Sequence, residues 1–332
     1  MAASGLMPAV PLLLHHAAGC VVLHKPPGLP FHATANHPGL LQVVRSQQGS
    51  QHLPYTGPLY PVHRLDSICS GALVLATSQE AAGELVSQFR QRKVQKYYVA
   101  LSERKPSKKM GTVAGGMEKG RRGSWLLTRS SALPAVTRFT SCACEGAAGE
   151  AHAAAQQQQQ QHGAEPQQAT EQREELQGGQ QPEEDEQQQG AQQAEVEHGQ
   201  REQRGPALRA FLLKPETGRT HQIRVAMKSL GAPVLGDERY ALKQAAARQD
   251  RGYLHCAALR FMLRGRPVQV VCPPQHGQHF GAPPFQQLFT GWFPPGMEED
   301  LGVWFEDSKL LRSGPLGAEE ETAGHGALDW QW

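Results

Sequence analysis

The stretch Pro61-Val62-His63-Arg64-Leu65-Asp66 leads through the small-residue turn Ser67-Ile68-Cys69-Ser70-Gly71 into the apolar run Ala72-Leu73-Val74-Leu75-Ala76. Branched apolar residues in such a run predict a buried strand. Asp66 therefore lies on a loop at the mouth of a strand, where a rigid scaffold can present a reactive side chain. Arg64 supplies a nearby positive charge that would keep this carboxylate ionised.

An ionised aspartate in this position can serve as a nucleophile, a general base or a metal ligand. The alternative is that Asp66 caps a turn and pairs with Arg64 at the surface, where ion pairs contribute little. This stretch alone leaves both interpretations open.

Two acidic segments of low complexity limit the part of the chain that folds. Residues 141–206 contain no aromatic residue, are rich in Gln, Glu, Ala and Gly, and include an unbroken Gln run at 156–161. Such a segment cannot bury enough apolar surface to offset the entropy of ordering it, so we predict a disordered insertion. The tail at 296–332 is also acidic and Gly-rich. The rest is ample for one sizeable core.

The same division changes the meaning of the net charge, which is only +2 for the 332-residue chain. The insertion and the tail together hold 5 Lys and Arg against 22 Asp and Glu, which leaves 28 against 9 in the body, a net charge of +19. A body this basic is expected to bind a polyanion, and nucleic acid is the commonest one. A basic surface without a partner is the alternative.

The cysteines and the N-terminus bear on the compartment. The 6 cysteines are scattered and show neither a zinc spacing nor a disulfide framework, which favours a reducing compartment. An apolar patch at 12–14 has no basic residue before Lys25, so it makes a poor signal peptide and a poor Arg-rich transit peptide. We expect an intracellular protein without a membrane span, cytoplasmic or organellar (chloroplast or mitochondrion).

The rest of the chain reads as strands with two helices. Ser78 is a good N-cap for a helix, and Tyr97 and Tyr98 should point to opposite faces of the strand that follows it. A long basic loop is expected over 104–122, and a second helix near Arg224 should end at Gly231. Strands are predicted at 20–24, 72–76, 96–101, 125–127, 135–139, 208–213, 254–261 and 268–272. The insertion then lies between two strands of one sheet.

Three stretches together resemble the RluA-type family of RNA pseudouridine synthases. They read Pro-Val-His-Arg-Leu-Asp-x-x-x-Ser-Gly at 61–71, Lys-x-Tyr-x-Ala-Leu at 96–101 and Thr-Gly-Arg-Thr-His-Gln-Ile-Arg-Val at 217–225. Gly236-Asp237-x-x-Tyr240 and Leu254-His255-x-Ala257 look like the family's later signatures. One such motif is weak evidence, whereas five in this order are highly specific. The resemblance extends from about Val21 to Val271.

This resemblance implies an isomerase that converts a uridine in structured RNA, either rRNA or tRNA, to pseudouridine. Such enzymes detach the uracil, rotate it and reattach it through carbon. The catalytic residue would be Asp66, with attack on the sugar or on the base left open. Four residues would bind the substrate. Arg64 would replace the extruded base, and Tyr98 would lie against that base. Arg224 would pair with Asp66, and Leu254 would pack under the base. A planar, stacking cation suits Arg64's role because extrusion costs a few kcal/mol of unstacking.

The resemblance also implies an α+β fold with a mixed, largely antiparallel sheet and a central RNA-binding cleft. We expect an N-terminal extension at 1–18, a catalytic domain at 19–295 interrupted by the insertion, and an acidic tail at 296–332. No metal, cofactor or obligate protein partner is expected, and the protein should be a monomer. Ala226, Met227 and Cys69 depart from the residues usual in the family, without touching the expected chemistry.

Two other functions remain possible from the sequence. One is a catalytically inactive RNA-binding protein of the same fold, although Asp66, Tyr98 and Arg224 are all present. The other is a carboxylate-dependent glycoside hydrolase, which needs a second acidic residue in a body that has few.

Overall fold

The computed structural model of the chain describes residues 11–17, 19–130, 134–144 and 208–297. The insertion, which is predicted to be disordered, and the acidic tail lie outside these residues, apart from 141–144 and 296–297. None of the described helices has the length and apolar content needed to cross a bilayer.

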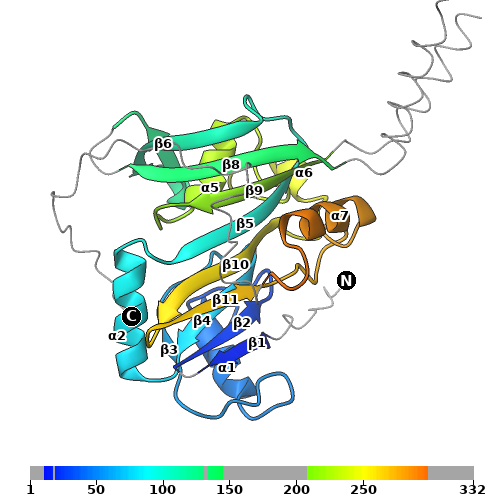
Figure 1. The fold of residues 1–332 in the computed structure, drawn as a ribbon. Helices are drawn as coiled ribbons and strands as arrows, with labels where there is room; N and C mark the ends of the chain where they lie inside the picture. The colour runs from blue at the N-terminus through cyan, green and yellow to red at the C-terminus, as the bar shows by residue number, and fades with distance from the viewer. Residues whose placement is uncertain (1–10, 18, 131–133, 145–207, 298–332) are drawn as a thin grey trace, which may run out of the picture.

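One mixed sheet runs through the described residues (Figure 1). Neighbouring strands follow the order β1-β2-β4-β10-β5-β9-β8-β6-β7, with β11 paired to β10 and β3 to β4. Only β4 and β10 pair in parallel among the described strands, which confirms the largely antiparallel sheet. The strands are β1 (Leu12–Ala17), β2 (Cys20–Lys25), β3 (Tyr60–Pro61), β4 (Cys69–Ala76), β5 (Gln95–Ser102), β6 (Met110–Lys119), β7 (Trp125–Thr128), β8 (Ala135–Ala143), β9 (Arg209–Pro215), β10 (Leu254–Leu263) and β11 (Arg266–Val271).

Two separate apolar clusters cover the two faces of this sheet. Along β5, Tyr98 belongs to one apolar cluster and Tyr97 to another, as the predicted alternation requires. Ser78 accepts a hydrogen bond from the Ala81 amide at 3.2 Å and caps α2 as predicted, and Gly231, with φ of +74°, follows α5. The helices are α1 (Leu40–Gln47), α2 (Gln79–Arg90), the short 3₁₀ turn η1 (Arg121–Gly123), α5 (Gln222–Ser229), α6 (Lys243–Ala246) and α7 (Pro283–Trp292).

Three segments differ from the sequence-based expectation. The basic stretch predicted as a loop contains β6, which pairs with β8 on one side and β7 on the other. Residues expected in an N-terminal extension form β1, which pairs with β2. Helix α7 was not predicted, although Phe285, Phe289 and Trp292 give it a buried stripe at helical spacing.

The parallel contact between β4 and β10 fixes the strand that follows Asp66. Gly71 has φ of +110°, and a Cβ atom built there would lie 2.3 Å from the carbonyl oxygen of Cys256. Only glycine permits this approach of two backbones. The loop that carries Asp66 is therefore attached to a strand pinned in the centre of the sheet.

Candidate active site

Asp66 forms an ion pair with Arg224, a residue that is distant in the sequence. Nη1 of Arg224, on α5, donates to Oδ2 of Asp66 at 3.2 Å. The Asp66 side chain is 19% exposed and that of Arg224 only 6%, so the carboxylate remains open to solvent on one side. Arg64, by contrast, is exposed, and its side chain forms no hydrogen bond or ion pair with the described part of the chain. The cation that pairs with Asp66 is therefore Arg224, as the family resemblance implied, and the alternative of a surface pair between Asp66 and Arg64 is not found in the described part of the chain.

A second carboxylate holds Arg224 more tightly than Asp66 does. Asp237 accepts from Nε of Arg224 at 2.7 Å and from Nη2 at 2.8 Å, and it is completely buried. Burial alone would lower the pKa of Arg224, but its hydrogen bonds to Asp237, with the charges of Asp237 and Asp66, raise it. This bidentate pair fixes the plane of the guanidinium and aims its remaining edge at Asp66.

Tyr98 and Leu254 lie in the apolar cluster beside this ion pair. Tyr98 is 8% exposed and Leu254 3% exposed, and both belong to the cluster that also contains Leu65, next to Asp66, and Ile223, next to Arg224. Burial, followed by the neighbouring Cys256 and more weakly by Asp66, raises the pKa of Tyr98 well above its usual range. The phenol is neutral near pH 7, and its hydroxyl already forms a hydrogen bond with the Cys256 thiol.

The backbone that carries Asp66 is anchored from β2. The buried Lys25 donates from Nζ to the carbonyl oxygens of Pro26 at 2.9 Å and Ser67 at 3.3 Å, and the Gly28 amide donates to the same Ser67 oxygen at 2.8 Å. Burial lowers the pKa of Lys25 to about 8, against the opposing effects of Cys69 and Asp66. The Lys-Pro-Pro-Gly turn at 25–28 thus fixes the carbonyl group of Ser67, the residue directly after Asp66.

The two histidines of the motifs, His63 and His221, make structural hydrogen bonds. Nε2 of His63 accepts from the Val74 amide at 3.0 Å, and its ring stacks on Phe89. His221, at the start of α5, bonds through Nδ1 to the hydroxyl of Tyr240 at 2.9 Å.

One buried group of potential metal ligands lies elsewhere in the sheet. His24, His255 and Cys272 offer atoms within 4.8 Å of one another. However, His255 uses both ring nitrogens, at 2.7 Å to the Ser70 hydroxyl and at 2.6 Å to the Cys272 carbonyl oxygen. Since the Cys272 carbonyl oxygen can only accept, Nε2 carries the proton of the neutral ring, and Nδ1 accepts from the Ser70 hydroxyl. His255 therefore has no free lone pair for a metal.

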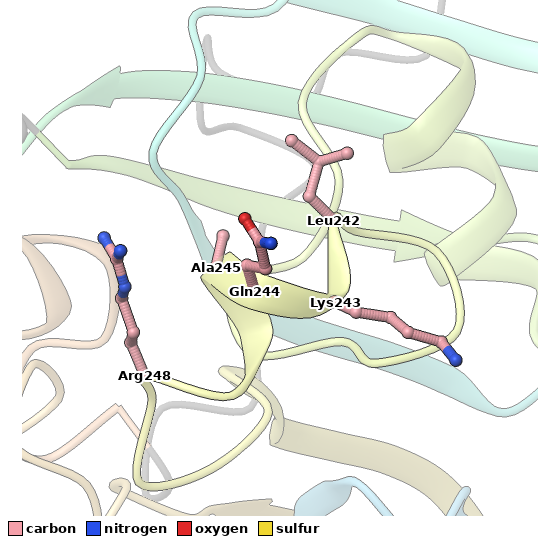
Figure 2. A pocket seen from close by; sticks show the side chains of 5 residues that line it. All are labelled: Leu242, Lys243, Gln244, Ala245 and Arg248. Carbon is pink, nitrogen blue, oxygen red and sulfur yellow. The ribbon is translucent and has the colours of Figure 1, made fainter.

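A surface hollow of about 340 Å³ lies at α6 (Figure 2). None of the residues proposed for catalysis or base binding lines it, and Lys243 and Arg248 extend on opposite sides of the short helix. The hollow is thus separate from the Asp66 site. Its lining residues are Leu242, Lys243, Gln244, Ala245 and Arg248.

Sequence reasoning predicted Asp66, Arg64, Tyr98, Arg224 and Leu254 as site residues and did not predict two buried partners. Asp237 stands in the Gly-Asp-x-x-Tyr signature, which is the signal that could have found it, but no role was predicted for it. Lys25 directly follows the strand predicted at 20–24, and the sequence alone does not show that this lysine is buried.

Comparison with known proteins agrees with this fold. Residues 19–229 match the family model described as RNA pseudouridylate synthase. An uncharacterised RNA pseudouridine synthase of Haemophilus influenzae is 33% identical over 269 residues, covering 81% of this chain and 90% of the relative. The dual-specificity RNA pseudouridine synthase RluA of Escherichia coli is 26% identical over 248 residues, covering 75% and 85%.

Two solved structures share the fold. Human RNA pseudouridylate synthase domain containing 1 has a TM-score of 0.54 at 20% identity and covers 81% of this chain and 86% of that one. Human RNA pseudouridylate synthase domain containing 4 has a TM-score of 0.51 at 22% identity, covering 81% and 90%. From the family match and the Haemophilus relative, the chain belongs to the RNA pseudouridine synthase family, as an RluA-type member and hence an isomerase.

Proposed function

We propose that this protein isomerises a uridine in structured RNA, in rRNA or tRNA, with Asp66 as the catalytic residue. The observation that carries the proposal is an ion pair. The partly exposed Asp66 pairs with Arg224, which Asp237 in turn holds in place. A carboxylate kept ionised and oriented in this way can attack the sugar or the base, or support the departing uracil, while the glycosidic bond breaks.

The substrate-binding roles follow from the surroundings of Asp66. Leu254 and the neutral phenol ring of Tyr98 supply an apolar wall for a uracil. Arg64 is exposed and has no hydrogen bond or ion pair within the described part of the chain, so it can enter a helix and stack in the place of the extruded base.

A basic surface near the site favours RNA as the partner. The segment at 104–129 exposes eight cations and one carboxylate, Glu118. Neutralising phosphates with such side chains gives affinity that falls with salt. The exposed cations are Arg104, Lys105, Lys108, Lys109, Lys119, Arg121, Arg122 and Arg129.

Glycoside hydrolysis fits this site less well. That chemistry needs two carboxyl groups flanking the bond. The carboxylate that shares Arg224 with Asp66 is Asp237, which is completely buried and already bound at both oxygens. We further propose that β1 to α7 form a single catalytic domain, acting as a monomer without an obligate partner and without metal or cofactor.

The direct test is tritium release from 5-tritiated uridine in rRNA and tRNA transcripts. We expect release with the wild type and at least a roughly 10³-fold loss with Asp66→Asn, with RNA affinity within about twofold, since catalytic groups act mainly on the rate. Glu238→Gln, at an exposed carboxylate, is the matched control and should keep full activity. A wild type that binds RNA but releases no tritium from any transcript would instead favour the inactive binding protein.

A further inference from the structure

Tyr240 joins three parts of the chain that are distant in sequence. Its ring lies 5.0 Å from Cζ of Arg224 and 5.7 Å from Nζ of Lys228. Its hydroxyl accepts from the Trp125 amide at 2.8 Å and bonds to Nδ1 of His221 at 2.9 Å. Tyr240 is 5% exposed, so these contacts are made in a nearly dry environment.

The hydrogen bonds of Arg224 leave one motion open, and the ring of Tyr240 opposes it. Asp237 holds Nε and Nη2 along one edge of the guanidinium, and Asp66 accepts a single, longer bond from Nη1. A group held along one edge can still tilt about that edge. The aromatic ring covers the guanidinium and attracts its charge, which resists the tilt.

Tyr240 is in turn fixed by a projecting part of the sheet, the arm, which we define as residues 110–128 (β6, η1 and β7). Trp125 opens β7, and the neighbouring Arg239 donates from Nη1 to the carbonyl oxygen of Arg122 in η1. The turn that holds Arg224 is therefore attached to the arm at two points. Lys119, Arg121 and Arg122 are exposed at that end of the arm.

We propose that Tyr240 is a positioning residue: its ring holds Arg224 against Asp66, and its hydroxyl fixes that ring to the arm and to His221. The proposal rests on the proposed function for its effect on rate, but the geometry it claims exists in the RNA-free protein. It gives a role to the tyrosine of the Gly-Asp-x-x-Tyr signature.

Two variants separate the ring from the hydroxyl. Tyr240→Phe keeps the ring over Arg224 and loses both hydroxyl bonds, whereas Tyr240→Leu also removes the ring. Under single turnover with saturating RNA, we expect a loss of about threefold to tenfold for the first and at least about thirtyfold for the second, because a misplaced positioning group lowers the rate. RNA affinity should stay within about twofold. Tyr253→Phe is the control and should keep the wild-type rate. Tyr253 lies in the other apolar cluster, and this change removes its hydroxyl, which donates to Asp250.

A second readout needs no RNA and no activity. In ¹⁵N-labelled protein, the Arg224 Nε–H resonance is identified by its loss in Arg224→Lys, and we expect it to shift in Tyr240→Leu but not in Tyr253→Phe. An unchanged resonance in Tyr240→Leu, or a rate equal to that of the wild type, would overturn the proposal. So would equal rate losses in Tyr240→Leu and Tyr253→Phe, which would indicate a general structural effect. If the wild type itself is inactive, the proposed function fails, while the resonance still decides the role of Tyr240.

Discussion

Arg224 is a single cation shared unequally by two carboxylates. Asp237 takes two of its donors inside the protein, and Asp66 takes one at the solvent boundary. Breaking a buried pair by removing one partner costs about 3–5 kcal/mol because an uncompensated charge is left behind. Asp237 is thus the structural partner of the arginine, and Asp66 is the carboxylate that can exchange this contact for one with a substrate.

Histidine 63 gives a testable pH dependence of stability. Burial, with a smaller effect of Lys96, lowers the pKa of His63 to about 3, and Nε2 must stay unprotonated to accept from the Val74 amide. In the unfolded chain the same group takes up a proton near pH 6.5. The unfolded state therefore binds more protons below that pH, and stability falls as the pH falls from about 6.5 toward 3, by about 2 kcal/mol between pH 7 and pH 5.

The measurement is the free energy of unfolding by urea at pH 7 and at pH 5. His63→Gln keeps an acceptor and lacks the titration, so its loss between the two pH values should be smaller than that of the wild type. His52→Gln, at an exposed histidine, should leave the loss unchanged. An equal loss in His63→Gln and the wild type would contradict this account.

At the scale of elements, the parallel contact of β4 with β10 decides whether the site can form. Adding a Cβ at Gly71 forces a backbone atom of Cys256 to move and places a non-glycine residue at φ of +110°. We expect Gly71→Ala to destabilise the fold by about 3 kcal/mol or more, as measured by urea unfolding.

Gly83, in the exposed part of α2, is the matched control. A Cβ there meets nothing within 4 Å, so Gly83→Ala should stabilise the protein by about 0.5–1 kcal/mol through helix propensity. If the two alanine variants had similar stability, the close approach at Gly71 would not be the constraint described above.

The elements that carry local signals were predictable from the sequence, and those held by pairing alone were not. β4 has its apolar run, α2 its Ser78 cap and β5 its alternating faces. In β6, by contrast, most side chains are exposed and two adjacent glycines interrupt any alternation, so backbone bonds to β7 and β8 alone define it. β1 also lacks a local strand signal, and it is held by pairing with β2 and by Leu13 and Leu14, which pack against the core.

The same distinction applies to the candidate site. Asp66, Tyr98 and Arg224 stand in motifs whose residues could be recognised along the chain, and the pairing of Asp66 with Arg224 was expected and is found. Asp237 and Lys25 act through burial and through contacts with backbone or charge across the fold. Those properties depend on tertiary packing, which periodicity and spacing do not report.

At the scale of the whole molecule, the acidic segment between β8 and β9 enters at the end of a continuous hairpin. The Cys144 amide donates to the Leu208 carbonyl oxygen at 2.8 Å, so the two described ends are already side by side. Deleting 145–204 would leave three residues, a normal hairpin loop. We expect stability to stay equal or to rise by up to about 2–3 kcal/mol, because a shorter loop costs less entropy to close.

Thermal and urea unfolding of the deletion variant would check this expectation. A large fall in melting temperature would show that the deleted segment supports the fold. RNA affinity should be measured in parallel, because the deletion removes 13 acidic residues and 3 basic ones. Tighter RNA binding by the deletion variant would indicate that the segment shields the basic body.

The position of β10 has one more consequence. A cut between β8 and β9 would leave Asp66 and Tyr98 on the first fragment and Arg224, Asp237 and Tyr240 on the second. Neither fragment would hold a complete site, and β10 of the second must insert between β4 and β5 of the first. Two separately expressed halves of this enzyme would regain activity only by interleaving their strands, so that fragment complementation would report assembly of the whole sheet.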